Sequence, residues 1–580
     1  MTSAPSSTPG PLNPGDVVSA AIQLYRDRFK TYIGLSAIAT LWVALPFVAF
    51  SILAYFMVAY SITNSAAWAL FVLSAIFLFL YCWAKYSMYT GLLARLSFRE
   101  LVSEPETPDQ ARRQLAPKLW SYIGLSLLLL LIFIVAFIGI YLAATIVGFA
   151  VAFGLGTLFN QLFGDTGAFL GGVVGGLLIF GIFVIGMLWV ASRFFIAEVP
   201  ISMETPTGAS ESIGRSWSLT KRSILRIQFV VVATYLSALP PALLFNILPQ
   251  FFLLRLEPGT TAYNVTSLFI ILGSILVSIA IMPFWQAVKG ILYYDLRSRR
   301  EGLDLISVYS GRRLFNTIKI QTPESVELEF ALAGVGSRAV ALIIDYIILG
   351  FSLLLIFWFS IYVLSQLSQI EVWASVDTAT VQLWVMAIAF LILFAVYVGY
   401  FVGFETAWYG QTPGKRYAKI RVIQDDAQPV RVFQATLRSL LRPVDDILFL
   451  GFFCILFNKR EKRLGDWLAG TLVVQIDPDN TKNKITTSAD AKAMSAVLIE
   501  VIDFNRVSPD DFATVRAYLQ RRPMLTAIAR KEVSLQLARQ IKNKVKLETL
   551  PAEMTADTFL EAVYWGYQER NQKRAPNRPL

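Results

Sequence analysis

The sequence has 580 residues, of which 56% are hydrophobic and 16% are charged, so the chain is too apolar to form several ordinary soluble domains. Its apolar residues form long runs, and Tyr122–Phe149 and Phe169–Val190 exceed the ~18 to 20 residues that cross a ~30 Å hydrocarbon layer as a helix. There is no histidine, and the two cysteines, Cys82 and Cys454, lie in apolar segments. These facts exclude most histidine-based hydrolase and zinc sites, and we predict neither a cofactor nor a metal.

The net charge of +11 comes from Lys and Arg residues that gather in short loops between the apolar runs. This distribution is typical of the positive-inside rule of membrane proteins rather than of a nucleic-acid-binding surface. We therefore expect the lipid bilayer as a partner, and no nucleic acid.

Eight apolar segments are long enough to be membrane-spanning helices. The loops between them alternate in charge, and the Lys/Arg bias places the cation-rich loops and the N-terminus in the cytoplasm. Because Met1–Asn13 lacks a basic segment followed by a short apolar run, we expect no cleavable signal peptide. The predicted spans are residues 33–60, 66–92, 121–147, 168–195, 229–253, 266–292, 339–365 and 382–404.

The first six spans form a loosely repeated unit, since the pentapeptide Tyr-Ile-Gly-Leu-Ser of residues 32–36 recurs at residues 122–126. A tryptophan and a cation also recur near the ends of even-numbered spans, although the aromatic belt of any membrane protein would explain this second echo alone. These pairs are Trp83 with Lys85, Trp189 with Arg193, and Trp285 with Lys289. We predict a six-span domain, made of three helix-plus-hairpin units, over residues 1–304.

Amphipathic stretches precede the odd-numbered spans. In Asp16–Phe29, the side chains of Val18, Ala21, Tyr25 and Phe29 follow helical spacing. Such a helix is expected along the cytoplasmic membrane surface, and Glu211–Arg226 has the same character.

The segments Leu12–Asp16, Ser212–Trp217 and Tyr293–Arg297, the last followed by Glu301–Asp304, carry a resemblance. Residues 11–304 resemble the membrane domain that precedes some glycerophosphoryl diester phosphodiesterases and that stands alone in many bacterial proteins. No catalytic barrel follows in this chain, so the resemblance implies a membrane domain without that enzyme activity.

A second module follows the basic linker Arg297–Arg313. Ile318–Phe330 alternates like two short strands, and Ala418–Ile423 and Thr471–Ile476 are further strand candidates. Three motifs belong to this module: Gly334–Arg338, Gly410–Arg416 and Arg463–Thr471, with Arg442-Pro443-Val444-Asp445 between the last two. With these motifs, residues 316–476 strongly resemble the RDD family of bacterial membrane proteins. The resemblance implies that Arg338, Asp345 and Asp445 are the residues that name the family, and it implies a bacterial inner-membrane location.

Ionisable residues in or beside an apolar span are costly to insert, so their presence suggests function. Arg338 and Asp345 are separated by about 10 Å of helical rise, too far for easy direct contact, and Arg442 is the expected partner of Asp345. Arg338 is expected to interact with Asp345 or Asp445. The four residues could form an ion or proton site, or a buried lattice that only holds helices together.

Other charged motifs have plainer interpretations. Gly410–Arg416 lacks the spacing of a phosphate-binding loop and is expected to form a turn. Lys415 and Arg416 would then meet lipid head groups or serve as a topology anchor. Adjacent Asp445 and Asp446 point about 100° apart on a helix, which argues against a shared proton.

The segment Val432–Phe457 contains an apolar part, Ile447–Phe457, of only about 16 Å as a helix. We therefore predict a re-entrant or interfacial helical hairpin with both ends in the cytoplasm. This places the C-terminus in the cytoplasm as well.

Residues 485–580 are predicted to form a small soluble helical unit in the cytosol. Ser508 begins one helix, Thr555 caps another, and Met524, Ile528, Leu535, Ala538 and Val545 form one apolar stripe. The tail after Glu569 is charged and expected to be mobile.

Together these features predict an all-α polytopic membrane protein with short cytoplasmic strands. The leading hypothesis is a transport or permeability protein, of the cation/proton exchange type, whose ion or proton site contains Arg338, Asp345 and Asp445 with Arg442 as a partner. The alternative is a non-catalytic scaffold or assembly factor whose C-terminal helices bind a cytosolic protein. We predict no enzyme activity, because no nucleophile, base and orienting group are visible together.

Overall fold

The computed structural model describes residues 11–60, 64–102, 104–205, 208–306, 316–321, 327–367, 378–447, 449–458, 460–476, 485, 487–547 and 554–574. Among them, eight helical segments are long and apolar enough to cross a membrane. The predicted all-α polytopic membrane fold is therefore confirmed. The helices are α2 (Phe29–Ala59), α3 (Ser65–Leu101), α5 (Leu119–Phe163), α6 (Asp165–Phe194), α9 (Ile224–Ala242), α11 (Thr261–Glu301), α13 (Val335–Leu367) and α14 (Thr378–Ala407).

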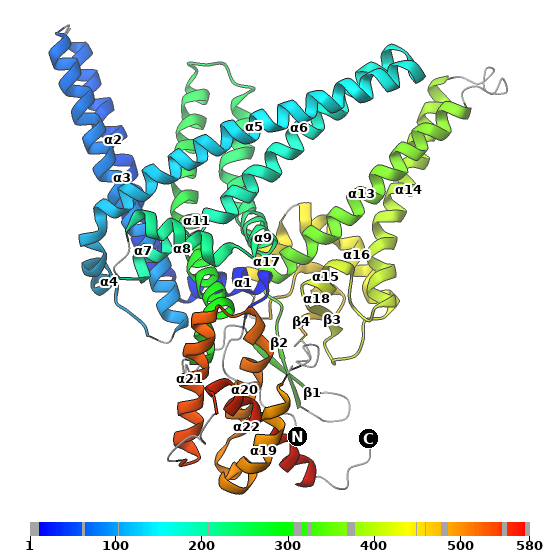
Figure 1. Cartoon of the computed structure of the whole chain (residues 1–580). Helices are drawn as coiled ribbons and strands as arrows, with labels where there is room; N and C mark the ends of the chain where they lie inside the picture. The colour runs from blue at the N-terminus through cyan, green and yellow to red at the C-terminus, as the bar shows by residue number, and fades with distance from the viewer. Residues whose placement is uncertain are drawn as a thin grey trace.

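The hairpins α2–α3, α5–α6 and α13–α14 diverge from a common base, where the short helices and the strands lie (Figure 1). Away from the base the hairpins expose large apolar side chains that no other part of the described chain covers. Phe153 on α5 is 76% exposed and Phe390 on α14 is 72% exposed. Apolar surface of this extent needs lipid around it, as expected of an integral membrane protein.

The fifth span is irregular. The two prolines Pro240 and Pro241 remove backbone donors from α9, and the chain continues through the π-helical turn η2 (Leu243–Ile247) into α10 (Leu248–Leu253). Between the other spans lie α4 (Pro108–Leu115), η1 (Ala116–Lys118), α7 (Val199–Met203), α8 (Ala209–Thr220) and α12 (Leu303–Ile306).

The first amphipathic stretch forms α1 (Pro14–Asp27), but it is enclosed by α9, α11 and α13 instead of lying exposed along the membrane surface. Val17 and Val18 are fully buried there, while Phe29 begins α2 and is 53% exposed. Glycine permits the close approach to α13, since a Cβ on Gly336 would fall 2.4 Å from the carbonyl oxygen of Gly15. The predicted membrane-surface placement of this helix was wrong, because its apolar stripe packs on protein.

Four short strands form two antiparallel pairs. β1 (Thr317–Gln321) pairs with β2 (Glu327–Ala331), and β3 (Ile420–Gln424) pairs with β4 (Thr471–Gln475). Strands β3 and β4 confirm the two strand candidates Ala418–Ile423 and Thr471–Ile476, which pair although they are far apart in the chain. Residues 322–326, between β1 and β2, lie outside the described residues.

Residues 432–457 form two short helices, α16 (Val432–Ile447) and α17 (Leu450–Phe457), which pack against each other. Phe449 stands between them with a left-handed φ of 53°. Neither helix is among the eight long apolar ones, which agrees with the predicted helical hairpin. Two further short helices, α15 (Pro413–Tyr417) and α18 (Leu464–Leu468), flank the sheet of β3 and β4.

The C-terminal helices form their own apolar core from α19 (Ala489–Val501), α20 (Pro509–Arg521), α21 (Ala527–Lys544) and α22 (Ala556–Arg574), with the turns η4 (Phe504–Arg506) and η5 (Arg522–Met524) between them. Ser508 caps α20 and the hydroxyl of Thr555 accepts from the amide of Thr558 at the start of α22, as predicted. Most of the predicted mobile tail lies outside the described residues.

The predicted apolar stripe of this unit was partly wrong. Ala538 and Val545 are buried, but Met524, Ile528 and Leu535 are exposed. Met524 precedes α21, and the buried face of that helix is made by Ala529, Val533, Leu537 and Ile541 instead. The pattern therefore followed the wrong face of the helix.

Candidate ion-binding site

The four predicted site residues lie at the end of α13 and α14 that faces the strands. Arg338 and Asp345 come from α13, Arg442 and Asp445 come from α16, and Asp345, Arg442 and Asp445 are buried. They do not form one cluster. Each has its own set of partners.

Arg338 pairs with Asp466, whose Oδ2 lies 2.8 Å from its Nη1. Its other nitrogens donate to the carbonyl oxygens of Ala333 and Glu461 at 2.9 and 2.6 Å. The predicted interaction with Asp345 or Asp445 was therefore wrong. Arg338 stands in the first turn of α13, and helical side chains lean toward the N-terminus of their helix, which takes the guanidinium away from Asp345.

Asp345 is fully buried and accepts three hydrogen bonds from neutral donors. The hydroxyls of Thr412 and Tyr400 donate at 2.6 and 3.0 Å, and the amide of Gly414 donates at 2.8 Å. Gly414 is needed for this approach, since a Cβ there would fall 2.0 Å from the carbonyl oxygen of Ala341. Among the described residues, no Lys or Arg forms an ion pair with Asp345.

The expected pairing of Arg442 with Asp345 was wrong. Arg442 pairs with Asp446, one helical turn further along α16, at 3.2 Å. Its guanidinium carbon lies 3.5 Å from the centre of the Phe401 ring. Asp446 also accepts from the hydroxyl of Tyr346 at 2.6 Å, so this charge is satisfied beside α13 and α14.

Asp445 points elsewhere, toward α18. Its Oδ2 accepts from the amide of Gly465 at 3.0 Å and lies 3.9 Å from Arg463, while its Oδ1 has no hydrogen-bond partner among the described residues. Asp445 and Asp446 thus have different partners, in line with the predicted divergence of the two side chains.

A row of buried charges that sequence reasoning did not assign to the site lies beside Asp345. Lys415 pairs with Glu405, Glu405 also faces Arg438 at 3.4 Å, and Arg438 pairs with Asp466. Arg463 approaches Asp466 at 3.3 Å. This charge row joins α14, α15, α16 and α18, and Arg338 connects it to α13.

Of the two alternatives for Lys415, contact with lipid head groups is contradicted, because its side chain is buried against Glu405. Burial is the main reason that the pKa of Lys415 falls to about 7, and the neighbouring Arg438, Arg442 and Arg463 also disfavour its charge, whereas Glu405 opposes the fall. Burial would raise the pKa of Asp466, but its three arginine neighbours outweigh burial and hold it below the ordinary value. Lys415 is thus the cation of the row that loses its proton near neutrality.

The signals for these residues were present in the sequence. Glu405 is a carboxylate at the end of an apolar run, and Asp466 and Arg463 stand in the motif that carries the family resemblance. Their mutual pairing depends on contacts between distant segments, which spacing along the chain does not show.

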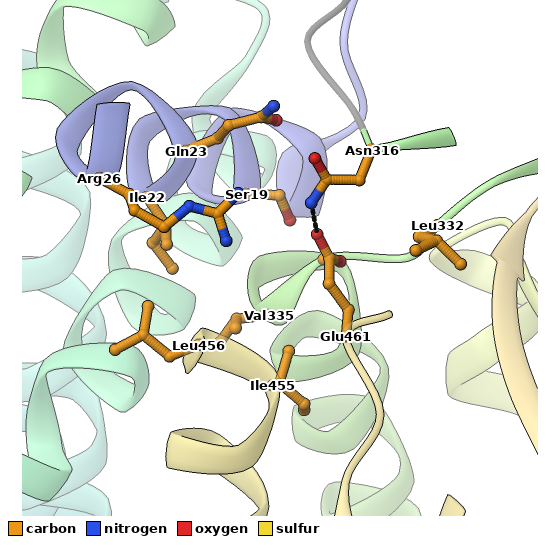
Figure 2. Close-up of a pocket in the computed structure, with 11 residues that line it drawn as sticks. Ser19, Ile22, Gln23, Arg26, Asn316, Leu332, Val335, Ile455, Leu456 and Glu461 are labelled. Carbon is orange, nitrogen blue, oxygen red and sulfur yellow. Dashed lines mark hydrogen bonds between the residues drawn. The ribbon is translucent and has the colours of Figure 1, made fainter. Parts of the chain in front are cut away.

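A separate small cavity lies where α1 meets α13 and α17 (Figure 2). It has a volume of about 20 Å³, which suffices for one water molecule. Glu461 accepts there from the Asn316 amide at 2.6 Å, and its other carboxylate oxygen is buried without a hydrogen-bond partner in the described chain. Burial raises the pKa of Glu461. The cavity is too small for an organic substrate.

Comparison with known proteins identifies one segment of the chain. The RDD family model matches residues 332–470. No curated protein and no solved structure matches the chain. The resemblance of residues 11–304 to the membrane domain of glycerophosphoryl diester phosphodiesterases stays a prediction, since the family match begins after that region. The matched segment contains Arg338, Asp345, Asp445 and the charge row, and we conclude that this integral membrane protein carries an RDD family domain at residues 332–470.

Proposed function

We propose that the protein is a cation/proton transporter in which Asp345 binds the transported ion. The observation that carries this proposal is the set of partners around Asp345: it is fully buried, yet only neutral groups donate to it. A buried carboxylate without an ion-pair partner in the described chain can bind a small cation with its oxygens. Among the described residues of the domain, no other buried carboxylate has only neutral hydrogen-bond donors and no nearby Lys or Arg side chain.

The other buried charged residues near Asp345 have a structural role in this proposal. Asp466 and Glu405 face arginine or lysine on several sides, and Arg442 and Asp446 neutralise each other. Breaking such a buried pair leaves an uncompensated charge, so these groups cannot change partners readily during a transport cycle. Asp345, in contrast, forms no ion pair with a described residue, so no ion pair has to break when it binds or releases an ion.

The oxygen atoms around Asp345 suit either a proton or a hard monovalent cation. A hydroxyl can donate or accept, so Thr412 and Tyr400 can donate to an empty carboxylate and turn their lone pairs toward a bound cation. Alkali and other hard cations prefer oxygen ligands of this kind. The same three side chains can therefore serve both states of an exchange cycle.

The test is flux in vesicles reconstituted with the purified full-length protein. Wild type should move protons when a gradient of Li⁺, Na⁺ or K⁺ is applied. Asp345→Asn keeps the shape of the side chain but removes its charge, so it should stay folded and lose the flux. Asp426→Asn makes the same chemical change in the exposed turn after β3 and should behave as wild type. Wild-type vesicles without flux for all three cations at several pH values would overturn the proposal.

A specific observation favours the scaffold as the second candidate. The C-terminal helices are attached to α12 and to the end of α11, because Arg521 pairs with Asp304 of α12 at 2.7 Å and the amide of Thr526 donates to the carbonyl of Arg300 in α11 at 3.0 Å. They also present the exposed apolar side chains of Met524 and Ile528. Under this alternative wild type shows no flux, and Ile528→Lys, which leaves the helical core untouched, releases a bound cytosolic protein.

We also propose that the protein lies in a bacterial inner membrane with both termini in the cytoplasm. The Lys/Arg distribution supports this orientation. Met524→Cys, in a variant with Cys82 and Cys454 replaced by serine, places one exposed thiol in the C-terminal unit. It should react with an impermeant thiol reagent only after the cells are permeabilised, and labelling of intact cells would contradict the orientation.

A further inference from the structure

Three arginines at the base of the six-span half lie near one another, and none has a carboxylate partner in the part of the chain that the structure describes. Arg193 ends α6, Arg222 lies between α8 and α9, and Arg300 stands in the last turn of α11. Arg300 is close enough to Arg222 and Arg193 to be repelled by both. Among the described residues none of the three forms an ion pair with a carboxylate.

Arg193 is the most buried of the three, with 6% of its surface exposed. Its guanidinium carbon lies 4.3 Å from the ring centre of Trp217 and 5.3 Å from that of Trp189. Nη1 donates to the carbonyl oxygen of Trp217 at 3.4 Å, but Nε is buried and has no partner in the described chain. The indole rings thus orient a guanidinium that retains an unused donor.

The nearby carboxylates are already occupied by other arginines. Glu204 and Glu301 pair with Arg215, and Asp295 pairs with Arg226 and Arg299. Arg300, in contrast, has a buried Nη2 without a hydrogen-bond partner among the described residues. The cluster therefore carries an excess of positive charge that the described part of the chain does not neutralise.

The position of the cluster indicates where a counter-anion would come from. Trp189 and Trp217 are 40% and 39% exposed, as expected of tryptophans at the boundary between lipid and water. Beside them, Arg222 is exposed and the apolar Leu225 at the start of α9 is 72% exposed. Cations and apolar surface side by side are typical of the level at which phospholipid head groups lie.

We propose that Arg193, Arg222 and Arg300 bind the phosphate group of an anionic phospholipid. A guanidinium presents several donors in a planar fork that matches phosphate oxygens; Arg222 presents its fork at the surface, and Arg193 and Arg300 place further positive charge close to it. A lipid phosphate would neutralise the excess charge while its acyl chains lie against the apolar surface near Leu225. This site lies in the six-span half, apart from Asp345, and does not depend on the transport proposal.

The experiment measures the thermal unfolding of full-length protein in neutral detergent, with added phosphatidylglycerol, phosphatidylcholine or inorganic phosphate. Phosphatidylglycerol should raise the midpoint temperature of wild type well above the effect of phosphatidylcholine. Arg222→Gln should lose most of this difference, and the double variant with Arg193→Gln should lose all of it. Arg112→Gln removes an exposed arginine of α4 and should keep the wild-type response.

Several outcomes overturn the proposal. One is an equal response to the two lipids, and another is an unchanged phosphatidylglycerol response in Arg222→Gln. A stabilisation by inorganic phosphate as large as that by phosphatidylglycerol would exclude a lipid and indicate a soluble phosphate ligand. If the variant with the buried Arg193→Gln does not fold, the phosphatidylglycerol response of Arg222→Gln is sufficient to test the proposal. The side chain of Arg222 is exposed in the structure, so its replacement leaves the core intact.

Discussion

The hydroxyl of Thr412 donates a hydrogen bond of 2.6 Å to Asp345 while it caps the first turn of α15 by accepting from the amide of Lys415 at 3.2 Å. One side chain therefore joins the buried carboxylate of α13 to the start of a helix 67 residues later. Since the next amide in this turn, that of Gly414, also donates to Asp345, α15 supplies two of the three donors.

We expect Thr412→Val to destabilise the protein, because the substitution removes both hydrogen bonds and leaves a buried carboxylate with one donor fewer. The cost should be about 1–3 kcal/mol in the free energy of unfolding. Thr412→Ser keeps the hydroxyl and serves as the control. The measurement is unfolding of the purified protein by denaturant in detergent, and equal stability of the valine and serine variants would refute the bridging role of Thr412.

The charge row gives a second prediction. Asp466 faces Arg338, Arg438 and Arg463, so Asp466→Asn leaves three cations without their shared counter-charge. Arg338→Ala leaves Asp466 with two arginines. Both changes should destabilise, and Asp466→Asn should cost more, about 3–5 kcal/mol for a fully buried group. The same unfolding titrations check the order, and a larger loss in Arg338→Ala would show that Asp466 is not the centre of the row.

The sequence predicted the membrane spans correctly but did not predict which buried charged residues pair. The reason for this difference is physical. Length and hydropathy alone locate spans, because the hydrocarbon layer sets the length of any helix that crosses it. The partner of Arg338 is 128 residues away, and neither helical spacing nor charge pattern reports which distant segment arrives there. The burial of Lys415 was missed for the same reason, since a basic loop residue is ordinarily exposed.

Amphipathic patterns show a similar limit. The apolar stripe of α1 was recognised, but a stripe does not say whether lipid or protein covers it. In the structure α13 covers it, with Ser19 of α1 accepting from the amide of Gly336 at 3.1 Å. In α21 the pattern selected Ile528 and Leu535, which are exposed, whereas Val533, Leu537 and Ile541 lie on the buried face.

The titration of Lys415 leads to a pH prediction. Its pKa in the folded protein is about 7, below the ordinary value of 10.5, so the unfolded chain binds more protons between these two pH values. Stability should therefore rise as the pH increases from about 7 toward 10, by up to about 1.4 kcal/mol per pH unit from this group. Lys415→Met cannot titrate, so its stability should rise less over this interval. Parallel pH profiles of the two proteins, measured by denaturant unfolding, would exclude Lys415 as a titrating group.

The crossing of α1 and α13 offers the sharpest comparison of two variants on one helix. A Cβ on Gly336 would lie 2.4 Å from the carbonyl oxygen of Gly15 and 2.5 Å from the Cβ of Val18, whereas a Cβ on Gly350 meets nothing within 4 Å. Gly336→Ala must therefore push α1 away from α13 and strain the hydrogen bond of 2.8 Å between Ser337 and Asp16. Overpacking of this kind costs about 1–3 kcal/mol, while Gly350→Ala should be neutral or slightly stabilising, because alanine favours a helix over glycine. Thermal unfolding in detergent should give a lower midpoint for Gly336→Ala alone. Equal midpoint temperatures for the two variants would mean that the contact between α1 and α13 does not stabilise the packing of the first six spans on the RDD family domain.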